Sequence, residues 1–63
     1  MRFKVKEARA ECGYTQEELS RKSGVSRATI AGLESGSIMV TTTETLVKIA
    51  KALDKKVSDI FLE

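Results

Sequence analysis

The stretch TQEELSRKSGVSRATIAGLES, residues 15–35, decides the fold. Thr15 is followed three residues later by Glu18, which is the form of a capping box, so we predict that a helix begins there. Gly24 suits the left-handed end of that helix, and Ser26 suits the cap of a second helix that runs to residue 35. Because only three residues connect the two helices, they should meet at a steep angle.

The spacing inside this stretch meets several physical demands at once. Leu19, Ile30 and Leu33 are placed to pin the two helices together and onto a core. Ser20 is small where the second helix crosses the first, and Gly24 accepts a positive φ without strain. An arbitrary pair of amphipathic helices would rarely meet all of these demands, so we predict a helix-turn-helix motif here.

The rest of the chain is also predicted to be helical. Residues 3–12 form a first helix, and residues 57–62 form a last helical turn. Residues 37–43 are rich in β-branched side chains, so we predict an extended loop there, with a short strand as the alternative. The helix that follows has Thr41 and Glu44 as a possible capping box. Its apolar stripe is the most regular in the chain: Leu46, Val47, Ile49, Ala50 and Leu53.

Length and composition limit the kinds of site that this chain can form. The 63 residues leave room for a single domain, residues 1–63. A chain of this size buries only about 60% of the surface that it exposes when unfolded. Cys12 is the only cysteine and there is no histidine, so we expect neither a disulfide nor a metal site. The commonest general base near neutral pH is missing, and we expect no enzyme activity and no cofactor.

The charge pattern leaves two interpretations open. The formal net charge is +2, which is too small to decide by itself. Basic residues are concentrated in residues 1–9, 20–33 and 48–56. This distribution favours a basic face for nucleic acid, but it also fits an ordinary solvated surface.

The sequence carries no pattern typical of a membrane protein or an exported one. The longest purely apolar runs, Ile38-Met39-Val40 and Ile60-Phe61-Leu62, are far short of a membrane span. Residues 1–7 lack the apolar core of a signal peptide. A lone thiol fits a reducing environment. We therefore expect a cytoplasmic protein that does not contact a membrane.

The chain resembles a known family in four segments. These are YTQEEL at 14–19, GVSRATI at 24–30, LESG at 33–36 and LVKIAKAL at 46–53, which are similar to the Cro/CI-type (XRE) helix-turn-helix family. The resemblance covers about residues 5–62. It implies an all-α, five-helix, lambda-repressor-like DNA-binding domain. It also implies a bacterial or phage-encoded, nucleoid-associated regulator that binds the major groove of double-stranded DNA as a symmetric dimer.

Arg9 falls on the inner stripe of the first predicted helix, where a charge is unexpected. The resemblance implies that Arg9 pairs with Glu34 at the end of the third helix. Such a pair is needed if Arg9 points inward, because an unpaired buried charge is very costly. The alternative is that Arg9 extends into solvent and Glu34 merely lies at a helix end.

The third helix carries most of the predicted DNA contacts. Arg27, the first residue after the cap, is placed to read a guanine through O6 and N7, with a phosphate contact as the alternative. Ala28 is placed to meet a thymine methyl group. Gln16 is expected to bind a phosphate together with the amides that start the second helix. The full predicted DNA-binding set is Thr15, Gln16, Ser26, Arg27, Ala28, Thr29, Gly32 and Ser35.

Two features depart from the pattern of the family. Gly32 lies on the predicted outer face, where the resemblance implies a long polar side chain that reads bases, so we expect few direct base contacts. The loop after the third helix is one residue longer than the common form. It carries Ile38-Met39-Val40 in place of basic residues and proline. We expect this apolar loop to pack on the body of the domain or on a second subunit.

These features together predict a sequence-specific transcriptional regulator, a repressor that binds a palindromic operator as a homodimer. One helical turn cannot bury Ile60, Phe61 and Leu62 together against one core, so we predict that they form the dimer interface. The alternative is that this end completes the monomer core and that dimers form only on DNA. A different class of function is also open: an antitoxin or other protein-interaction module with a protein partner, in which DNA binding is secondary.

Overall fold

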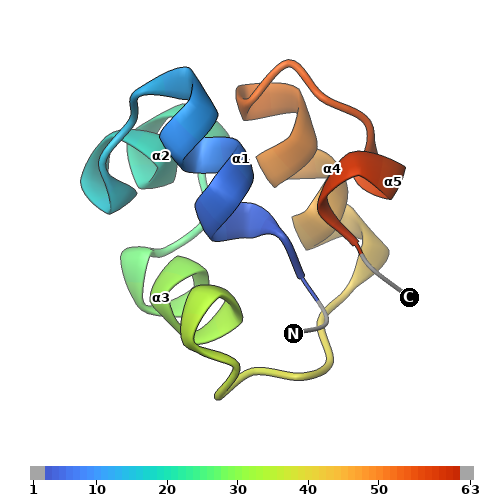
Figure 1. Cartoon of the computed structure of the whole chain (residues 1–63). Helices are drawn as coiled ribbons and strands as arrows, with labels where there is room; N and C mark the ends of the chain where they lie inside the picture. The colour runs from blue at the N-terminus through green and yellow to red at the C-terminus, as the bar shows by residue number, and fades with distance from the viewer. Residues whose placement is uncertain (1–2, 62–63) are drawn as a thin grey trace.

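The computed structural model describes residues 3–61, which form five helices (Figure 1). Their bounds are α1 Val5–Cys12, α2 Gln16–Ser23, α3 Arg27–Ser35, α4 Thr43–Ala52 and α5 Val57–Ile60. Among these residues the one β-type pairing is an isolated bridge between Phe3 and Phe61. The predicted all-α, five-helix, lambda-repressor-like fold is confirmed.

The helix-turn-helix follows from its capping residues. The hydroxyl of Thr15 accepts from the amide of Glu18 at 3.0 Å, and the carboxylate of Glu18 accepts from the amide of Thr15 at 2.8 Å, which completes the capping box. α2 ends at Gly24, whose φ of 75° is left-handed. The hydroxyl of Ser26 then accepts from the amide of Thr29 at 3.2 Å and starts α3. The boundaries predicted for both helices are confirmed.

Two serines close the turn between α2 and α3. The hydroxyl of Ser20 donates to the carbonyl of Val25 at 2.7 Å, and the hydroxyl of Ser23 accepts from the amide of Val25 at 3.1 Å. Backbone groups in so short a connection need side-chain partners when helical ones are out of reach. The turn is therefore fixed by these hydroxyls as well as by its glycine.

The segment before α1 pairs with the segment after α5. The amide of Lys4 donates to the carbonyl of Ile60 at 2.7 Å, beside the bridge between Phe3 and Phe61. This pairing holds Phe3 and Phe61 in extended conformations, so two predicted boundaries are wrong. α1 begins at Val5 instead of residue 3, and α5 ends at Ile60 instead of residue 62.

Residues 37–42 form the predicted extended loop, and no strand is present in it. The loop ends at Thr42, whose hydroxyl accepts from the amide of Thr45 at 3.1 Å and caps α4. The predicted capping box of Thr41 and Glu44 is therefore wrong by one residue. Either threonine hydroxyl could cap a helix, but the path of the loop backbone places Thr42 at the cap position.

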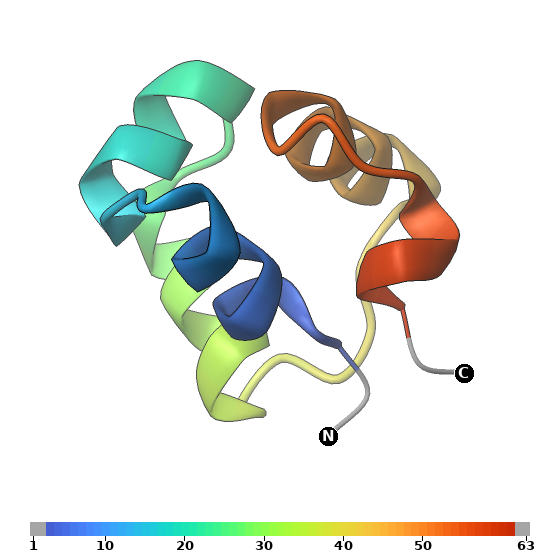
Figure 2. The same ribbon diagram turned by 45° about the horizontal axis from the view of Figure 1, so that its top comes forward.

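Each of the five helices contributes to one hydrophobic core. Its buried side chains are Phe3, Val5, Ala8, Leu19, Val25, Ile30, Leu33, Leu46, Ile49, Ala50, Leu53 and Ile60. Figure 2 shows α2 and α3 on one side of the molecule and α4 and α5 on the other, with α1 between them. Val47, predicted on the apolar stripe of α4, is only half-buried. Within residues 3–61, no helix is both long and apolar enough to cross a membrane.

Candidate nucleic-acid interface

The outer face of α3 is exposed at its two ends. Arg27 and Ala28 are exposed at its start and Ser35 is exposed at its end. Ile30 and Leu33 are fully buried on the opposite side. In the described part of the chain Arg27 makes no ion pair, so its guanidinium is available to an anion or a base.

Ser26 and Thr29 are occupied with starting α3. The hydroxyl of Ser26 accepts from the amide of Thr29 and lies 2.8 Å from the Thr29 hydroxyl. Thr29 is half-buried, whereas Ser26 is exposed. The two side chains therefore hold Arg27 at the first helical position of α3, on an ordered helix end.

A polar cluster of Arg9, Gln16 and Glu34 joins the first three helices. Arg9 Nε donates to Glu34 Oε2 at 2.7 Å, and Arg9 Nη2 donates to Glu34 Oε1 at 3.1 Å. Arg9 Nη1 also donates to the carbonyl of Tyr14 at 2.7 Å. Gln16 Nε2 donates to Glu34 Oε1 at 3.0 Å. The carboxylate of Glu34 on α3 thus accepts hydrogen bonds from the guanidinium of Arg9 on α1 and from the side-chain amide of Gln16 on α2.

The cluster is largely removed from water, and this shifts the titration of its charged groups. Glu34 is only 7% exposed, and burial by itself favours its neutral acid. The hydrogen bonds from Arg9 and Gln16 and the charge of Arg9 outweigh burial, so the pKa of Glu34 is lowered. The hydrogen bond to Glu34 likewise raises the pKa of Arg9, against a smaller effect of burial. The pair is therefore ionised at neutral pH.

The contact between Gln16 and Glu34 was not predicted from the sequence. The two residues are 18 positions apart, and no local pattern connects them. Gln16 lies at the first position of α2, where the resemblance implies a phosphate contact. The structure shows its amide nitrogen already held on one side by Glu34.

Gly32 was predicted to be accessible on the outer face of α3, and this prediction is wrong. It is buried, and the side chain of Ile38 from the α3–α4 loop covers it. Gly32 lies on the predicted face of α3, but Ile38 of the apolar loop, which was expected to pack on the domain or on a second subunit, folds back over it. Gly32 itself is therefore not accessible to DNA in this structure.

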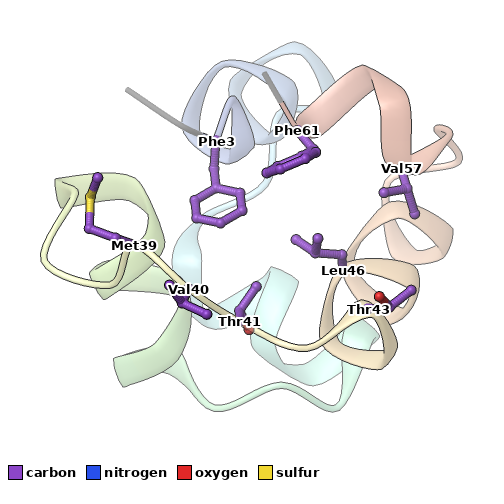
Figure 3. A pocket seen from close by; sticks show the side chains of 8 residues that line it. All are labelled: Phe3, Met39, Val40, Thr41, Thr43, Leu46, Val57 and Phe61. Atoms are coloured by element: carbon purple, nitrogen blue, oxygen red, sulfur yellow. The ribbon is translucent and has the colours of Figure 1, made fainter. Parts of the chain in front are cut away.

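An apolar groove lies between the α3–α4 loop and the paired ends of the described chain. It has a volume of about 290 Å³ and is lined by Phe3, Met39, Val40, Thr41, Thr43, Leu46, Val57 and Phe61 (Figure 3). The rings of Phe3 and Phe61 lie 5.6 Å apart between centroids, and Figure 3 shows Leu46 pointing toward them. Met39 is 50%, Val40 85% and Phe61 36% exposed. All three side chains border this one groove.

Of the residues predicted to form the dimer interface, Ile60 and Phe61 differ in their exposure. Ile60 is fully buried in the core of the monomer, so it is not available to a second subunit. Phe61 is exposed at the edge of the apolar groove, whereas Leu62 lies outside the described residues. The helix ends at Ile60 and Phe61 is extended, so the two neighbouring side chains differ in burial.

Several basic residues are paired with acids instead of forming one basic face. Lys55 Nζ lies 2.8 Å from Glu11 Oε1, and Lys48 Nζ lies 3.7 Å from Glu44 Oε2. The bond and charge of Lys55 lower the pKa of Glu11. In residues 48–56, the pattern of lysines therefore includes ion pairs of an ordinary solvated surface.

Comparison with known proteins gives consistent matches. A helix-turn-helix family model matches residues 5–60. The chain is 44% identical over 61 residues to YgzD, an uncharacterized HTH-type transcriptional regulator of Bacillus subtilis (strain 168), covering 97% of this chain and 91% of that protein. No solved structure matches the chain at a comparable level of similarity.

Similar proteins also occur in archaea. The chain is 42% identical over 62 residues to MJ0272, an uncharacterized HTH-type transcriptional regulator of Methanocaldococcus jannaschii, covering 98% of this chain and 92% of that protein. A regulator of the same description from Archaeoglobus fulgidus is 40% identical over 62 residues, covering 98% of this chain and 87% of that protein. The similarity thus extends over nearly the full length of both partners in each comparison.

Proposed function

We propose a function from the premise that this chain belongs to the Cro/CI-type helix-turn-helix family of transcriptional regulators. The protein binds a specific, near-palindromic operator as a homodimer and represses the promoter that the operator overlaps. One observation carries the proposal. Arg27 stands exposed at the first position of α3, beside the exposed Ala28, without an acidic partner among the described residues.

Base recognition is assigned to the start of α3. A recognition helix enters the major groove with its N-terminal residues, where arginine bonds guanine O6 and N7 together. Arg27 is exposed and is held at that end by the cap of Ser26. Ala28, also exposed, meets a thymine methyl group beside it. Ser35 contacts the DNA at the far end of the same face.

Phosphate binding is assigned to the start of α2. Gln16 Nε2 carries two hydrogens, and Glu34 accepts only one of them. The second hydrogen is left for a phosphate oxygen, beside the amides of the first turn of α2. Thr15 is exposed at the same helix end. These contacts position the protein without reading sequence.

Dimerisation is assigned to the apolar groove. A chain of this size carrying three exposed large apolar side chains around one groove presents a surface suited to a partner. A symmetric dimer buries the same groove on both subunits and presents the two α3 helices about 34 Å apart, one turn of DNA. The operator is then a near-palindrome, since each half-site meets an identical helix.

A selection of bound DNA from a random pool tests the proposal. At physiological salt with competitor DNA, we expect a near-palindrome bound at least about 10³-fold more tightly than random sequence. Arg27→Ala should relax the preference at one base pair per half-site, by roughly 1–3 kcal/mol. Gln16→Ala should weaken all sequences about equally. If Arg27→Ala instead weakens all sites uniformly, Arg27 binds phosphate and the role assigned to it is wrong.

The repressor role needs its own measurement. A reporter promoter that carries the selected operator across its start site should lose expression when the protein is supplied. A scrambled operator serves as the control. Increased expression from the intact operator would make the protein an activator.

The apolar groove also favours a second candidate function. An antitoxin or other interaction module would use the groove for a different protein and bind DNA only secondarily. The selection separates the two candidates, because a pure interaction module shows no ratio between specific and random DNA.

A further inference from the structure

Gly32 lies on the outer face of α3 and is nevertheless buried. Residues 28, 32 and 35 are separated by four and three positions, so they follow one face of the helix. Ala28 and Ser35 are exposed, whereas the core residues Ile30 and Leu33 lie on the opposite side. Packing against the core therefore does not explain the burial of Gly32.

The cover over Gly32 comes from the α3–α4 loop. A Cβ atom built on Gly32 would lie 2.6 Å from Cγ1 of Ile38, closer still to Cδ1 of Ile38, and 3.3 Å from the hydroxyl of Ser37. The side chain of Ile38 thus occupies the space in which residue 32 would carry its own. Ile38 is only half-buried, so part of this residue remains accessible to solvent.

Hydrogen bonds fix Ile38 in this place. The carbonyl of Gly32 accepts from the amide of Gly36 at 3.1 Å, the amide of Ile38 at 3.0 Å and the hydroxyl of Ser35 at 3.3 Å. The hydroxyls of Ser35 and Ser37 are also 3.1 Å apart. The backbone of Ile38 is therefore tied to the last turn of α3.

We propose that Ile38 determines operator specificity by contacting the C5 methyl group of one thymine per half-site, in place of the side chain that Gly32 lacks. This inference rests on the proposed function. A half-buried hydrocarbon side chain on this face has no donor or acceptor with which to read other base edges, and thymine is the base that presents a methyl group in the major groove. Burial of one methyl-sized group corresponds to an affinity change of about fourfold.

Replacement of single thymidines by deoxyuridine in the selected operator tests the proposal. Uracil keeps the hydrogen-bonding groups of thymine and lacks only the methyl group. The natural protein should bind about fourfold more weakly when one particular thymine in a half-site is replaced. Ile38→Ala should bind the thymine and uracil forms of that position equally. Ala10→Ser, at an exposed position of α1 outside the groove, should keep the ratio of the natural protein.

Two further variants make the test decisive. Ile38→Val removes only the Cδ1 carbon, so it keeps the fold and should give an intermediate ratio. Ala28→Gly should abolish the methyl dependence at a different thymine. If the ratios at every thymine are unchanged in both Ile38 variants, this inference is refuted while operator binding stands. If the selection yields no operator at all, the proposed function is refuted as well.

Discussion

The polar cluster of Arg9, Gln16 and Glu34 is complete within the described residues, whereas the apolar groove is left open by residues 3–61. In the cluster each side chain finds its partner in another helix, and among the described residues no buried side-chain nitrogen or oxygen lacks a hydrogen bond. In the groove, Val40 and Met39 remain largely in water. The difference separates what stabilises the monomer from what is left for a partner.

The largest effect is expected from removing the cation of the polar cluster. Arg9→Ala leaves the carboxylate of Glu34 without its cation, although only 6% of that side chain is exposed. Breaking a buried pair from one side costs about 3–5 kcal/mol, and we expect the lower end because Arg9 is partly exposed. Denaturant unfolding measures the loss. Lys48→Ala, which breaks a surface pair with Glu44, should cost less than about 0.5 kcal/mol. Equal losses in the two variants would contradict a stabilising cluster.

A smaller effect, which depends on pH, is expected from neutralising the carboxylate. Burial acts against ionisation of Glu34, but the bonds from Arg9 and Gln16 prevail and lower its pKa. The stability that it provides is therefore complete above the pKa of an unfolded glutamate, about 4.3, and is lost as the pH falls through the lower folded value.

The variant Glu34→Gln should accordingly lose about 2 kcal/mol at pH 7, the contribution of a hydrogen bond to a charged group. The difference from the natural protein should shrink as the pH falls below about 4. Thermal unfolding at a series of pH values measures it. Glu44→Gln is the matched surface control, with less than about 0.5 kcal/mol expected. A difference that stays constant down to pH ~3 would disprove the assigned role of the charge.

A substitution in the apolar groove should change dimerisation and leave the unfolding free energy of the monomer nearly unaltered. Val40 makes little contact within the monomer, so Val40→Glu should change the unfolding free energy by less than about 0.5 kcal/mol. If the groove is the dimer interface, losing a buried valine on each subunit should weaken the dimer at least about tenfold. Sedimentation equilibrium measures this change. Ala10→Glu, on an exposed position of α1 outside the groove, is the control. An unaltered dimer in Val40→Glu places the interface elsewhere.

The smallest effect is expected at the contact between Ile38 and Gly32, next to the apolar groove. Ile38 is packed on Gly32 within the monomer, whereas the next two loop residues, Met39 and Val40, are exposed at the apolar groove. In the Ile38→Ala background, Gly32→Ala should be stabilising by about 1 kcal/mol, the gain in helix propensity. In the natural protein the gain should be absent, because the new Cβ meets Ile38. Equal effects in both backgrounds, by denaturant unfolding, would show that the two residues are not coupled.

Local signals in the sequence predicted the helix-turn-helix correctly. The Thr15–Glu18 capping box, Gly24 and Ser26 each act on backbone groups within four residues, so their effect hardly depends on the rest of the chain. The apolar stripes of α3 and α4 are equally local, since they follow from helical periodicity. These elements fix the fold class and the exposed start of α3.

What the sequence did not predict depends on contacts between distant segments. The cover of Ile38 on Gly32 requires the path of the loop after α3, and the hold of Glu34 on Gln16 requires α2 and α3 to be already packed. The hydrogen bond between the Lys4 amide and the Ile60 carbonyl likewise joins segments that are almost the whole chain apart. Periodicity within one helix contains no information about such partners.

The bridge between Phe3 and Phe61 makes two segments open as one unit. α5 has only four residues, far fewer than a helix needs to persist alone in water. If the amide of Lys4 leaves the carbonyl of Ile60, both α5 and the segment before α1 lose their anchor. Their amides should therefore exchange with solvent at a common rate, as one cooperative unit of local unfolding. The same opening removes two walls of the groove, so a ligand bound there would slow hydrogen exchange at Lys4, far in sequence from the loop that it touches.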